Sequence, residues 1–571
     1  MPLDNRTDWW QHAVIYQIYI RSFADSDGDG VGDLRGLAQR LPYVRELGVD
    51  AIWICPFVRS PMRDFGYDVS DYCAIEPMFG SLQDFDAVVR QAHDLGLRVL
   101  MDQVWNHTSD QHPWFVESRA SRDNPKADWY VWADSAPDGG PPNNWRATFG
   151  GSAWSFDPTR RQYYLHNFLE QQPDLNWYSP QVRAALMETG RFWLDRGVDG
   201  FRLDVVNFYC HDRTLADNPE RAGGLPRPAG ASARDPYFDF INTGTVSRPE
   251  TLEVLAQIRR LMDAYPGTMT LGEISSAEDA LVTAGDYVSG NARLHTAYNS
   301  ALVSDQPFTA NHLRGLIDKV RRHFVDGHSC WTLGTHDFPR LKGRWSRHGR
   351  HSDELERRLD QLLLSLLVAL PGSCCLYQGD ELGLPQAQLT LEQLRDPFGI
   401  ANWGTVESRD GCRTPMPWRS DAPHAGFTTG TPWLPVPAEH LDLAVDRQHD
   451  NPHSLLNIYR EVIAWRRTQP ALRERGIALW ATDEPVLAFI RGQGAHRLLC
   501  VFNLSPSATR MTLAPSWQLA EANRAAVELS GDSLTLPGFG WAFLQEEESG
   551  ADHAANGCAS VAPGEGHCIS L

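Results

Sequence analysis

The sequence predicts an α/β protein built on a (β/α)8 TIM barrel, with an insertion domain after the third strand and a C-terminal antiparallel β-sandwich. Two observations predict the barrel: short apolar, β-branched runs recur along the chain, and amphipathic helical patterns separate them. Runs that are apolar throughout are typical of parallel strands buried on both faces, and eight strand–helix units form a closed barrel. A third observation, period-two alternation without helices from about residue 480, predicts the sandwich.

Each expected strand is an apolar run bounded by polar or glycine-containing segments. The expected strands are residues 13–20, 49–55, 97–104, 198–206, 268–274, 294–300, 330–337 and 373–380. Helical patterns, in which apolar residues return every three to four positions, occupy residues 34–47, 81–95, 180–196, 249–265 and 352–370. Helices that alternate with buried strands supply the crossover connections that a parallel sheet requires.

The connection after the third strand is too long to be a simple turn. Residues 105–175 are rich in Trp, Asp, Asn, Gly and Pro, and we expect them to form the insertion domain, because such long loops are usually small domains or lids. The barrel then comprises residues 1–104 and 176–478. Residues 479–546 are expected to form the sandwich, and the polar residues 547–571 a flexible tail.

The composition excludes several classes of partner. The chain of 571 residues has 52 Lys and Arg against 72 Asp and Glu, a net charge of 52 − 72 = −20. Because polyanion binding needs clustered cations, we expect no nucleic-acid or anionic-membrane partner. The N-terminus lacks the pattern of a signal peptide, and the longest apolar run is too short to span a bilayer. The ten cysteines are scattered without CxxC spacing, so we expect a cytoplasmic protein.

Polar residues gather where the expected barrel strands end, which is where such barrels carry their chemistry. These residues are Asp102, Asn106, His107, Arg202, Asp204, Glu273, His336, Asp337, Asp380 and Glu381. One carboxylate alone would indicate a helix cap or a surface charge, but several on one rim repel and raise each other's pKa. Paired carboxylates without HExxH, GxSxG or GxGxxG motifs favour hydrolysis of a glycosidic bond.

Five spaced motifs strengthen that interpretation. They are DQVWNH (102–107), QPDLNW (172–177), GFRLDVV (200–206), GEI (272–274) and GTHD (334–337). With these motifs in this order, the sequence resembles the α-amylase superfamily, glycoside hydrolase family 13, and within it the oligo-1,6-glucosidase and α-glucosidase branch. The resemblance covers nearly the whole chain.

The resemblance implies three catalytic residues: Asp204 as the nucleophile, Glu273 as the general acid/base and Asp337 as the carboxylate that holds the sugar hydroxyls. It also implies retention of configuration, for which the two reacting carboxyl groups lie roughly 5–5.5 Å apart. Such chemistry favours a low pKa for Asp204 and a protonated Glu273.

Further residues are implied to bind the sugar: Asp64, Tyr67, His107, Phe168, Arg202, His336 and Arg409. Arg202 would keep the nucleophile ionised by charge pairing. Asp64 and Arg409 would pair and close the pocket, so that only the end of a glucoside enters. Arg413 is the alternative partner of Asp64, and ordinary loop salt bridges are the structural alternative for both arginines.

Residues 25–33, DSDGDGVGD, carry carboxylates at alternate positions, like an EF-hand loop. The twelfth position is Gly36 rather than Glu, so the loop is not an EF-hand. The resemblance implies one structural Ca²⁺, or Mg²⁺, bound by Asp25, Asp27, Asp29 and Asp33 and by the Val31 carbonyl, with no organic cofactor. The alternative is a solvated acidic turn.

Three features bear on specificity. Thr335 and the segment 296–302 depart from the usual pattern, and they resemble α-glucosidases that transfer glucose to non-sugar acceptors such as alcohols or phenols. Val205, however, follows the nucleophile, and a valine at that position in this branch tends to accompany a preference for α-1,6 linkages. Seven tryptophans in or beside the insertion could supply sugar-binding faces, and we expect some to do so: Trp105, Trp114, Trp129, Trp132, Trp145, Trp154 and Trp177.

The sequence therefore predicts a retaining exo-α-glucosidase that acts on short, maltose-like α-glucosides and also transfers glucose. The alternatives on the same site are an oligo-1,6-glucosidase, and a sucrose isomerase or glucosyltransferase. A non-enzymatic relative of transporter heavy chains is disfavoured, because those proteins have a transmembrane helix and lack the full catalytic set, whereas Asp204, Glu273 and Asp337 are all present here.

Overall fold

The computed structural model describes residues 7–223, 225–228, 235–303, 308–341, 344, 351–520 and 527–546. The expected tail, residues 547–571, lies outside the described residues. Within the described residues, no helix is long and apolar enough to cross a membrane.

Eight parallel strands form a closed barrel, as predicted. They are β1 (Val14–Ile18), β2 (Ala51–Ile54), β5 (Arg98–Gln103), β9 (Gly200–Leu203), β10 (Met269–Ile274), β11 (Thr296–Asn299), β12 (His328–Thr332) and β13 (Ser373–Tyr377). β1 closes the barrel by pairing with both β2 and β13. The fourth and seventh strands end earlier than expected, so Asp204 and Asp337 lie on the loops that follow β9 and β12.

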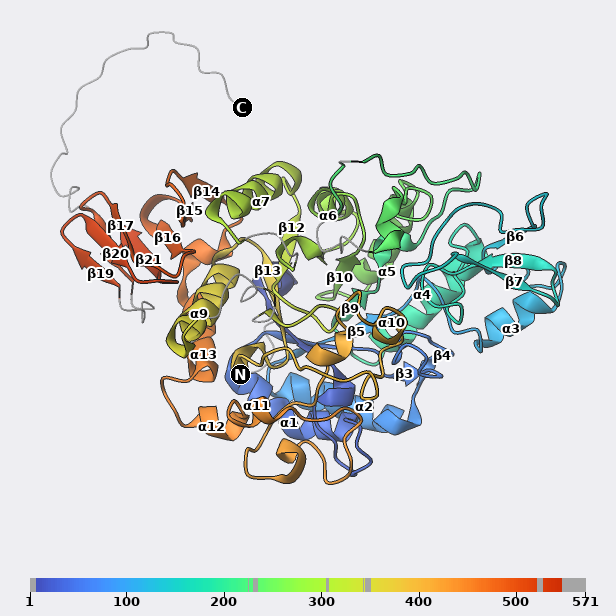
Figure 1. The fold of residues 1–571 in the computed structure, drawn as a ribbon, viewed down its shortest axis with the longest axis horizontal. Helices are drawn as coiled ribbons and strands as arrows, with labels where there is room; N and C mark the ends of the chain where they lie inside the picture. The colour runs from blue at the N-terminus through green and yellow to red at the C-terminus, as the bar shows by residue number, and fades with distance from the viewer. Residues whose placement is uncertain are drawn as a thin grey trace, which may run out of the picture.

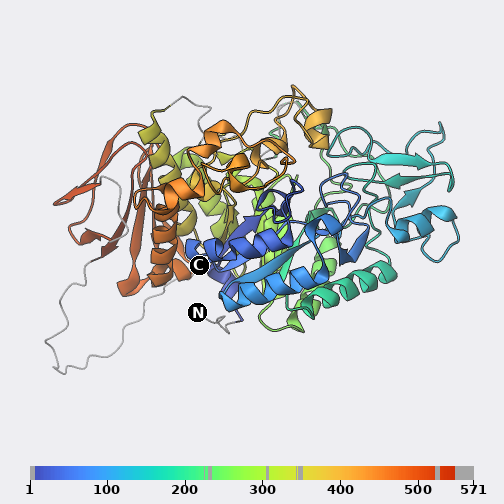
Figure 2. The same cartoon turned by 90° about the horizontal axis from the view of Figure 1, so that it is seen from below.

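Helices surround the barrel (Figures 1 and 2). The five predicted helices are α1 (Leu34–Leu47), α2 (Leu82–Asp94), α4 (Pro180–Leu194), α5 (Thr251–Asp263) and α9 (Asp353–Ala369). Further helices are α6 (Ala280–Val288), α7 (Ala310–His323), α10 (Pro397–Ala401), α11 (Ala438–Leu441), α12 (Val445–His449) and α13 (Leu455–Thr468). Local signals fix their ends: Ser81 and Asp84 form a capping box at the start of α2, for example.

The chain between β5 and α4 forms a small unit at one end of the molecule (right in Figure 1). It contains α3 (Pro113–Ala120) and a three-stranded antiparallel sheet of β6 (Trp132–Ala133), β8 (Gln162–Leu165) and β7 (Trp154–Asp157). Bridges between His107 and Asp174 and between Tyr130 and Leu175 join the beginning and end of this connection. The nearby hairpin of β3 (Val58–Arg59) and β4 (Asp71–Ile75) carries Asp64 and Tyr67 between its strands.

The C-terminal strands lie at the opposite end of the molecule (left in Figures 1 and 2). A five-stranded sheet contains β14 (Ile477–Trp480), β15 (Val486–Arg491), β16 (Leu498–Asn503), β21 (Trp541–Glu546) and β18 (Trp517–Leu519). A three-stranded sheet contains β17 (Thr509–Thr512), β20 (Ser533–Leu536) and β19 (Glu528–Ser530). The predicted antiparallel domain is confirmed.

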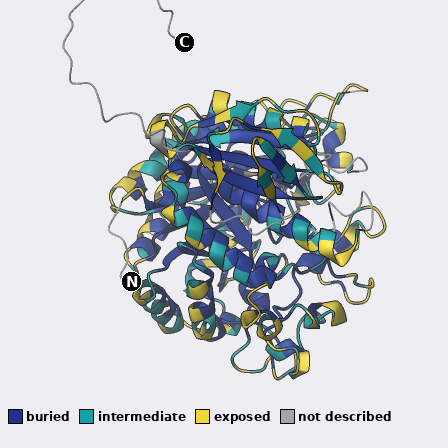
Figure 3. Ribbon diagram, turned by 90° about the vertical axis from the view of Figure 1, so that its left-hand side faces the viewer, coloured by how far each residue is buried: buried dark blue, intermediate teal, exposed yellow. Residues whose placement is uncertain are grey.

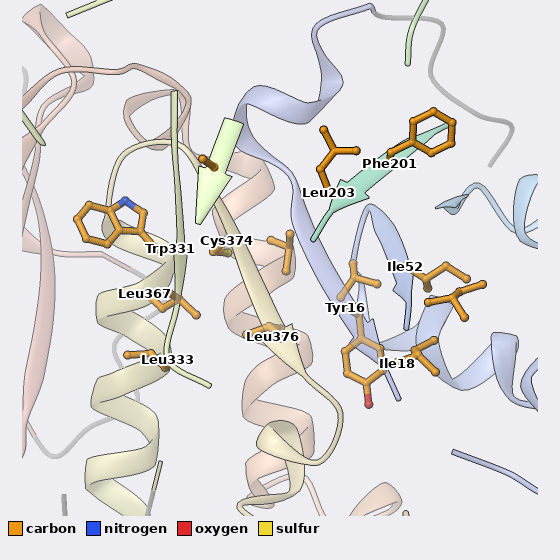
Figure 4. Close-up of a cluster of buried hydrophobic side chains, with 14 of the residues drawn as sticks. Tyr16, Ile18, Ile52, Phe201, Leu203, Trp331, Leu333, Leu367, Cys374 and Leu376 are labelled. Atoms are coloured by element: carbon orange, nitrogen blue, oxygen red, sulfur yellow. The ribbon is translucent and has the colours of Figure 1, made fainter. Parts of the chain in front are cut away.

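Apolar side chains fill both the barrel and the layer between barrel and helices. Figure 3, viewed from the side of the C-terminal sheets, shows buried residues along the strands, and Figure 4 shows part of the outer cluster, which includes Trp331 of β12, Leu367 of α9 and Leu376 of β13. A separate cluster inside the barrel includes Trp53 and Tyr298. Because protein cores are close-packed, this scaffold holds the strand ends in fixed positions.

Candidate active site

A cavity of about 200 Å³ opens at the carboxyl ends of the strands and is lined by the three predicted catalytic carboxylates. Asp204 directly follows β9, Glu273 lies on β10, and Asp337 follows β12. In the parallel register of β9 and β10, Leu203 is paired with Gly272, so the residues that come next, Asp204 and Glu273, lie side by side. The barrel register therefore brings the predicted nucleophile and acid/base together.

One buried guanidinium lies among the carboxylates. Nη1 of Arg202 donates to Asp204 Oδ1 at 2.6 Å and to Asp102 Oδ1 at 2.9 Å. Nη2 of Arg202 donates to Glu273 Oε2 at 2.5 Å. Arg202 has no exposed surface, so its charge acts on these groups with little solvent screening. The expected pairing of Arg202 with Asp204 is present, but three carboxylates share the same cation.

The surroundings of Asp204 in the protein without substrate do not favour the expected low pKa. Burial raises the pKa of the Asp204 carboxyl well above its usual value, and the charge of Arg202 only partly opposes that rise. Burial likewise raises the pKa of Asp102 to about 6 against the opposing charge of Arg202. Such close groups titrate as a unit. Burial of the cluster therefore works against ionisation of both Asp204 and Asp102.

Asp337 has the opposite electrostatic environment. Arg413 Nη2 donates to Asp337 Oδ1 at 2.8 Å, and Arg409 Nη1 does so at 3.2 Å. Burial disfavours the ionised carboxyl, but His336, Arg413 and Arg409 outweigh it and hold the pKa of Asp337 well below its usual value. Asp337 is therefore an ionised hydrogen-bond acceptor at the cavity.

His336 supports Asp337 from beneath. The amide nitrogen of Gln17 lies 2.7 Å from His336 Nδ1, and His336 Nε2 lies 3.2 Å from Asp337 Oδ2. Burial lowers the pKa of His336 well below its usual value, and the neighbouring Asp337 carboxylate opposes that shift. Tyr67 stacks on this ring with centroids 5.3 Å apart, and its hydroxyl donates to Asp102 Oδ2 at 3.1 Å. Tyr67 lines the cavity, whereas His336 does not.

The expected ion pair between Asp64 and Arg409 is present in the lining of the cavity. Arg409 Nη2 donates to Asp64 Oδ1 at 2.9 Å, while Arg413 contacts Asp337 instead. Asp64 lies in the β3–β4 hairpin and Arg409 in the insertion after β13, so two segments distant in sequence meet here. Of the two arginines considered for this role, Arg409 is the one that contacts Asp64.

His107 and Phe168 lie on a further wall of the cavity. His107 Nε2 lies 2.9 Å from the Tyr67 carbonyl oxygen, and burial lowers the pKa of His107 to about 4, so its ring is neutral. The Phe168 ring is tilted against it, with centroids 5.2 Å apart. Gln172 was not singled out from the sequence, although it begins the QPDLNW motif. Its amide donates to Asp64 Oδ2 at 3.3 Å and to the Tyr67 carbonyl at 3.1 Å.

Several lining residues come from segments that the sequence did not mark as functional. They are Thr148, Phe149, Asp235, Tyr237, Phe238, Ser275, Ser276, Phe338 and Phe398. The expectation that tryptophans of the insertion face the site is wrong, because none of the seven lines the cavity. Trp105 and Trp177, for example, are fully buried. Phenylalanine and tyrosine supply the aromatic surface instead.

The acidic loop 25–33 lies apart from the cavity. Carboxylate oxygens of Asp25, Asp27 and Asp29 all lie within 4.8 Å of one another, a hard-oxygen donor set that suits a divalent cation. Asp33 begins α1 instead: its Oδ1 accepts from the Gly36 backbone at 2.7 Å. The structure therefore brings three of the four predicted carboxylates into one cluster and gives the fourth a capping role.

The fold and the paired carboxylates define a glycoside hydrolase. A family model described as "Alpha amylase, catalytic domain" matches residues 17–475, and the chain belongs to this family. A "Probable alpha-glucosidase" of Rhizobium meliloti (strain 1021) is 47% identical over 549 residues, which cover 95% of this chain and 98% of the relative.

Two further comparisons place the chain in the predicted branch. An "Oligo-1,6-glucosidase" of Parageobacillus thermoglucosidasius is 34% identical and covers 87% of this chain and 90% of its own length. The crystal structure of "alpha-glucosyl transfer enzyme, XgtA" superimposes with a TM-score of 0.91 at 48% identity, covering 94% of this chain and 99% of that one. The sequence-based assignment to the oligo-1,6-glucosidase and α-glucosidase branch is thus confirmed.

Proposed function

We propose that this protein is a retaining exo-acting α-glucosidase that removes glucose from the non-reducing end of short α-glucosides and also transfers it to hydroxyl acceptors. The observation that carries the proposal is the cavity itself. Asp204 and Glu273 line it together with the Asp64–Arg409 ion pair. The relatives named as an α-glucosidase and an α-glucosyl transfer enzyme support the same activity.

The mechanism follows from the roles of the Asp204 and Glu273 carboxyl groups. The Asp204 carboxylate attacks the anomeric carbon while Glu273 gives its proton to the departing glycosidic oxygen, leaving a β-glucosyl ester on Asp204. Glu273, now ionised, removes a proton from water or from an acceptor hydroxyl, which attacks the anomeric carbon and releases Asp204. Two inversions give a product with the original α configuration. Asp337, ionised beside the cavity, accepts hydrogen bonds from sugar hydroxyls.

The ion pair explains attack at the chain end. In a glucopyranose ring, C4 lies across the ring from the anomeric carbon, so the O4 hydroxyl of a glucose at Asp204 points toward the opposite side of the cavity. We propose that the mostly buried salt bridge between Asp64 and Arg409 closes that side. A glucose with a free O4 hydroxyl fits against this pair, whereas a further sugar attached to O4 would collide with it.

The outer walls favour transfer to acceptors that carry apolar groups. Phe149, Phe238 and Phe398 line the cavity together with Tyr237. Phe149 and Phe398 come from different insertions, and their ring centroids lie 5.4 Å apart. Aromatic faces bind apolar faces of a ligand and leave water fewer hydrogen-bond partners. Alcohols and phenols are therefore the acceptors that we propose.

Product profiles on maltose, isomaltose and sucrose, with and without a phenol acceptor, test this proposal. We expect α-glucose as the first-formed anomer from maltose and an α-glucosyl phenol when the acceptor is present. A Phe398→Ala variant is expected to lower the ratio of transfer to hydrolysis by several-fold, because water gains access where the acceptor ring was held. Proton NMR of the products at early times gives both results, and β-glucose as the first product would contradict a retaining mechanism.

The alternative of an oligo-1,6-glucosidase has one observation in its favour. Val205, which follows Asp204 and lines the cavity, is the residue associated with α-1,6 preference in this branch. The isomaltose arm of the profile tests this alternative directly. The sucrose arm tests the isomerase alternative, since an isomerase would give a new disaccharide of glucose and fructose rather than free sugars.

We also propose that the cluster of Asp25, Asp27 and Asp29 binds one structural Ca²⁺. Its oxygens are hard ligands and lie close enough together to share a cation. The same loop hydrogen-bonds across to the strand-eight insertion, where Thr428 donates to Asp25. A cation here would stabilise the contact between these two segments without entering the chemistry.

Chelation tests the metal proposal. A ligand that binds only the folded state at about 100 times its Kd adds roughly 2.7 kcal/mol of stability. Removing calcium with a chelator should therefore lower the Tm by several degrees, while kcat at a temperature well below the transition stays the same. An Asp27→Asn variant should have the lower Tm already and respond less to the chelator. A Tm that the chelator leaves unchanged in the wild type would contradict a bound ion.

The cytoplasmic location is likewise a proposal. The eight cysteines among the described residues are all free, and seven of them are buried. Free buried thiols are typical of proteins from a reducing compartment.

A further inference from the structure

We infer that Asp396 is a positioning residue that holds the guanidinium of Arg409 against Asp64 and Asp337. Asp396 does not line the cavity and was not among the residues marked by the sequence motifs. The inference rests on the proposed function, because it assigns Asp396 a role in recognising the terminal glucose through Arg409.

The contacts of Asp396 converge on Arg409. Asp396 has no exposed surface. Its Oδ1 accepts from Arg409 Nη2 at 2.7 Å and from Arg409 Nε at 3.1 Å, and its Oδ2 accepts from the Arg409 backbone nitrogen at 3.1 Å. Both the side chain and the backbone of Arg409 are thus fixed by one carboxylate. Buried charge-assisted hydrogen bonds of this kind are stronger than neutral ones.

Asp396 fixes the guanidinium of Arg409, whose other hydrogen bonds go to two separate carboxylates. Nη2 reaches Asp64 and Nη1 reaches Asp337, and these acceptors come from different parts of the chain. Substrate hydroxyls would compete for the same carboxylates. Asp396 lies out of reach of the cavity, so it keeps its hold on Arg409 when a glucose enters. The charge of Arg409 outweighs the burial of Asp396 and lowers its pKa to about 2, so the carboxylate stays ionised.

Asp396 also connects the Asp64–Arg409 ion pair, called the clamp below, to Phe398 of the cavity wall. Its Oδ1 accepts from the Phe398 backbone nitrogen at 3.1 Å, which makes Asp396 the N-cap of α10. The guanidinium carbon of Arg409 lies 6.0 Å from the centroid of the Phe398 ring and 5.1 Å from that of Phe149. One buried carboxylate therefore sets the positions of the arginine and of the wall beside it.

The test is a double-mutant cycle between Asp396 and Arg409 on an aryl α-glucoside. Asp396→Asn keeps a capping oxygen for α10 but removes the charge that holds Arg409. A displacement of about 1 Å can cost on the order of 100-fold in rate. We therefore expect Asp396→Asn to lower kcat/KM by about that factor when Arg409 is present. In an Arg409→Ala background, the same change should lower kcat/KM less than 3-fold. Equal losses in both backgrounds would overturn the inference.

Asp410 offers a matched control from the same insertion. It is also fully buried, and its carboxylate accepts from the backbone nitrogens of Arg395 and Asp396 rather than from Arg409. Asp410→Asn should lower the Tm as much as Asp396→Asn does, and any loss of activity should be the same in both Arg409 backgrounds. If Asp410→Asn were coupled to Arg409 as strongly as Asp396→Asn is, general loosening of the insertion would explain the loss of activity, and the inference would be wrong.

A substrate change gives a readout that a purely structural role would not alter. We expect the loss caused by Asp396→Asn to shrink at least 5-fold when the aryl glucoside lacks its 4-hydroxyl, since the clamp then has no hydroxyl to hold. An undiminished loss on the 4-deoxy substrate would overturn the inference. Turnover of the parent glucoside by the wild-type protein tests the proposed function separately. A failure of the proposed function is therefore distinguishable from a failure of the role inferred for Asp396.

Discussion

Asp204→Asn should lower kcat on an aryl α-glucoside by at least about 10⁴-fold. The change keeps the size of the side chain and replaces the nucleophilic oxygen with an amide that does not form the glucosyl ester. A 10⁴-fold loss corresponds to about 5 kcal/mol of transition-state stabilisation. Steady-state kinetics measures the loss, and KM should change far less because the Asp64–Arg409 clamp is untouched.

Asp380→Asn is the matched control for this experiment. Asp380 is another carboxylate at a barrel strand end, but it lies outside the cavity, and its Oδ2 accepts from the Tyr377 backbone at 3.0 Å. We expect it to keep kcat within a few-fold of the wild type. If Asp204→Asn folded normally and retained near-wild-type turnover, the assignment of the nucleophile would be wrong.

Azide rescue of a variant without the carboxylate tests the same assignment of the nucleophile through the configuration of the product. In Asp204→Gly, a small anion can occupy the space of the missing carboxylate and attack α-glucosyl fluoride, which needs no acid to release its leaving group. The expected product is β-glucosyl azide, because only one inversion takes place. An α-glucosyl azide would mean that another nucleophile still acts in the variant.

Glu273→Gln has the second large effect, and its size depends on the leaving group. Without a proton donor, maltose should be cleaved about 10²–10⁴-fold more slowly. For 2,4-dinitrophenyl α-glucoside, whose leaving group needs no proton, glucosylation should proceed at close to the wild-type rate. The second step still lacks its base, so stopped-flow absorbance should show a burst of dinitrophenol followed by slow turnover.

Glu278→Gln controls for a lost charge on the segment that follows β10. Glu278 pairs with Arg221 at 2.5 Å and does not line the cavity. It should show neither the leaving-group dependence nor the burst. Equal losses on maltose and on the activated substrate would contradict the acid/base assignment of Glu273.

The barrel was predictable because its strands are buried on both faces and therefore carry a continuous apolar signal. The same regularity placed Asp204 and Glu273 together, since neighbouring parallel strands end at one rim. The contact between Asp64 and Arg409 was predictable only through the resemblance, because the two residues lie on distant loops whose path no local periodicity sets.

The residues that were missed share a physical cause. Phe149 and Phe398 lie in insertions, where an aromatic residue gives the same sequence signal whether it faces a core or a cavity. Asp396 reads as an ordinary helix cap until its contact with Arg409 is seen. The pKa of Asp204 could not be derived from its pairing with Arg202 alone, because burial of the carboxyl raises it more than the charge of Arg202 lowers it.

The most direct test of the account is the identity of the covalent intermediate. Glu273→Gln, mixed with α-glucosyl fluoride and quenched with acid, should accumulate an enzyme that carries one glucosyl group. Mass spectrometry of the peptides should locate that group on Asp204. A glucosyl group on any other residue, or continued turnover with no labelled enzyme at any time after mixing, would contradict the account.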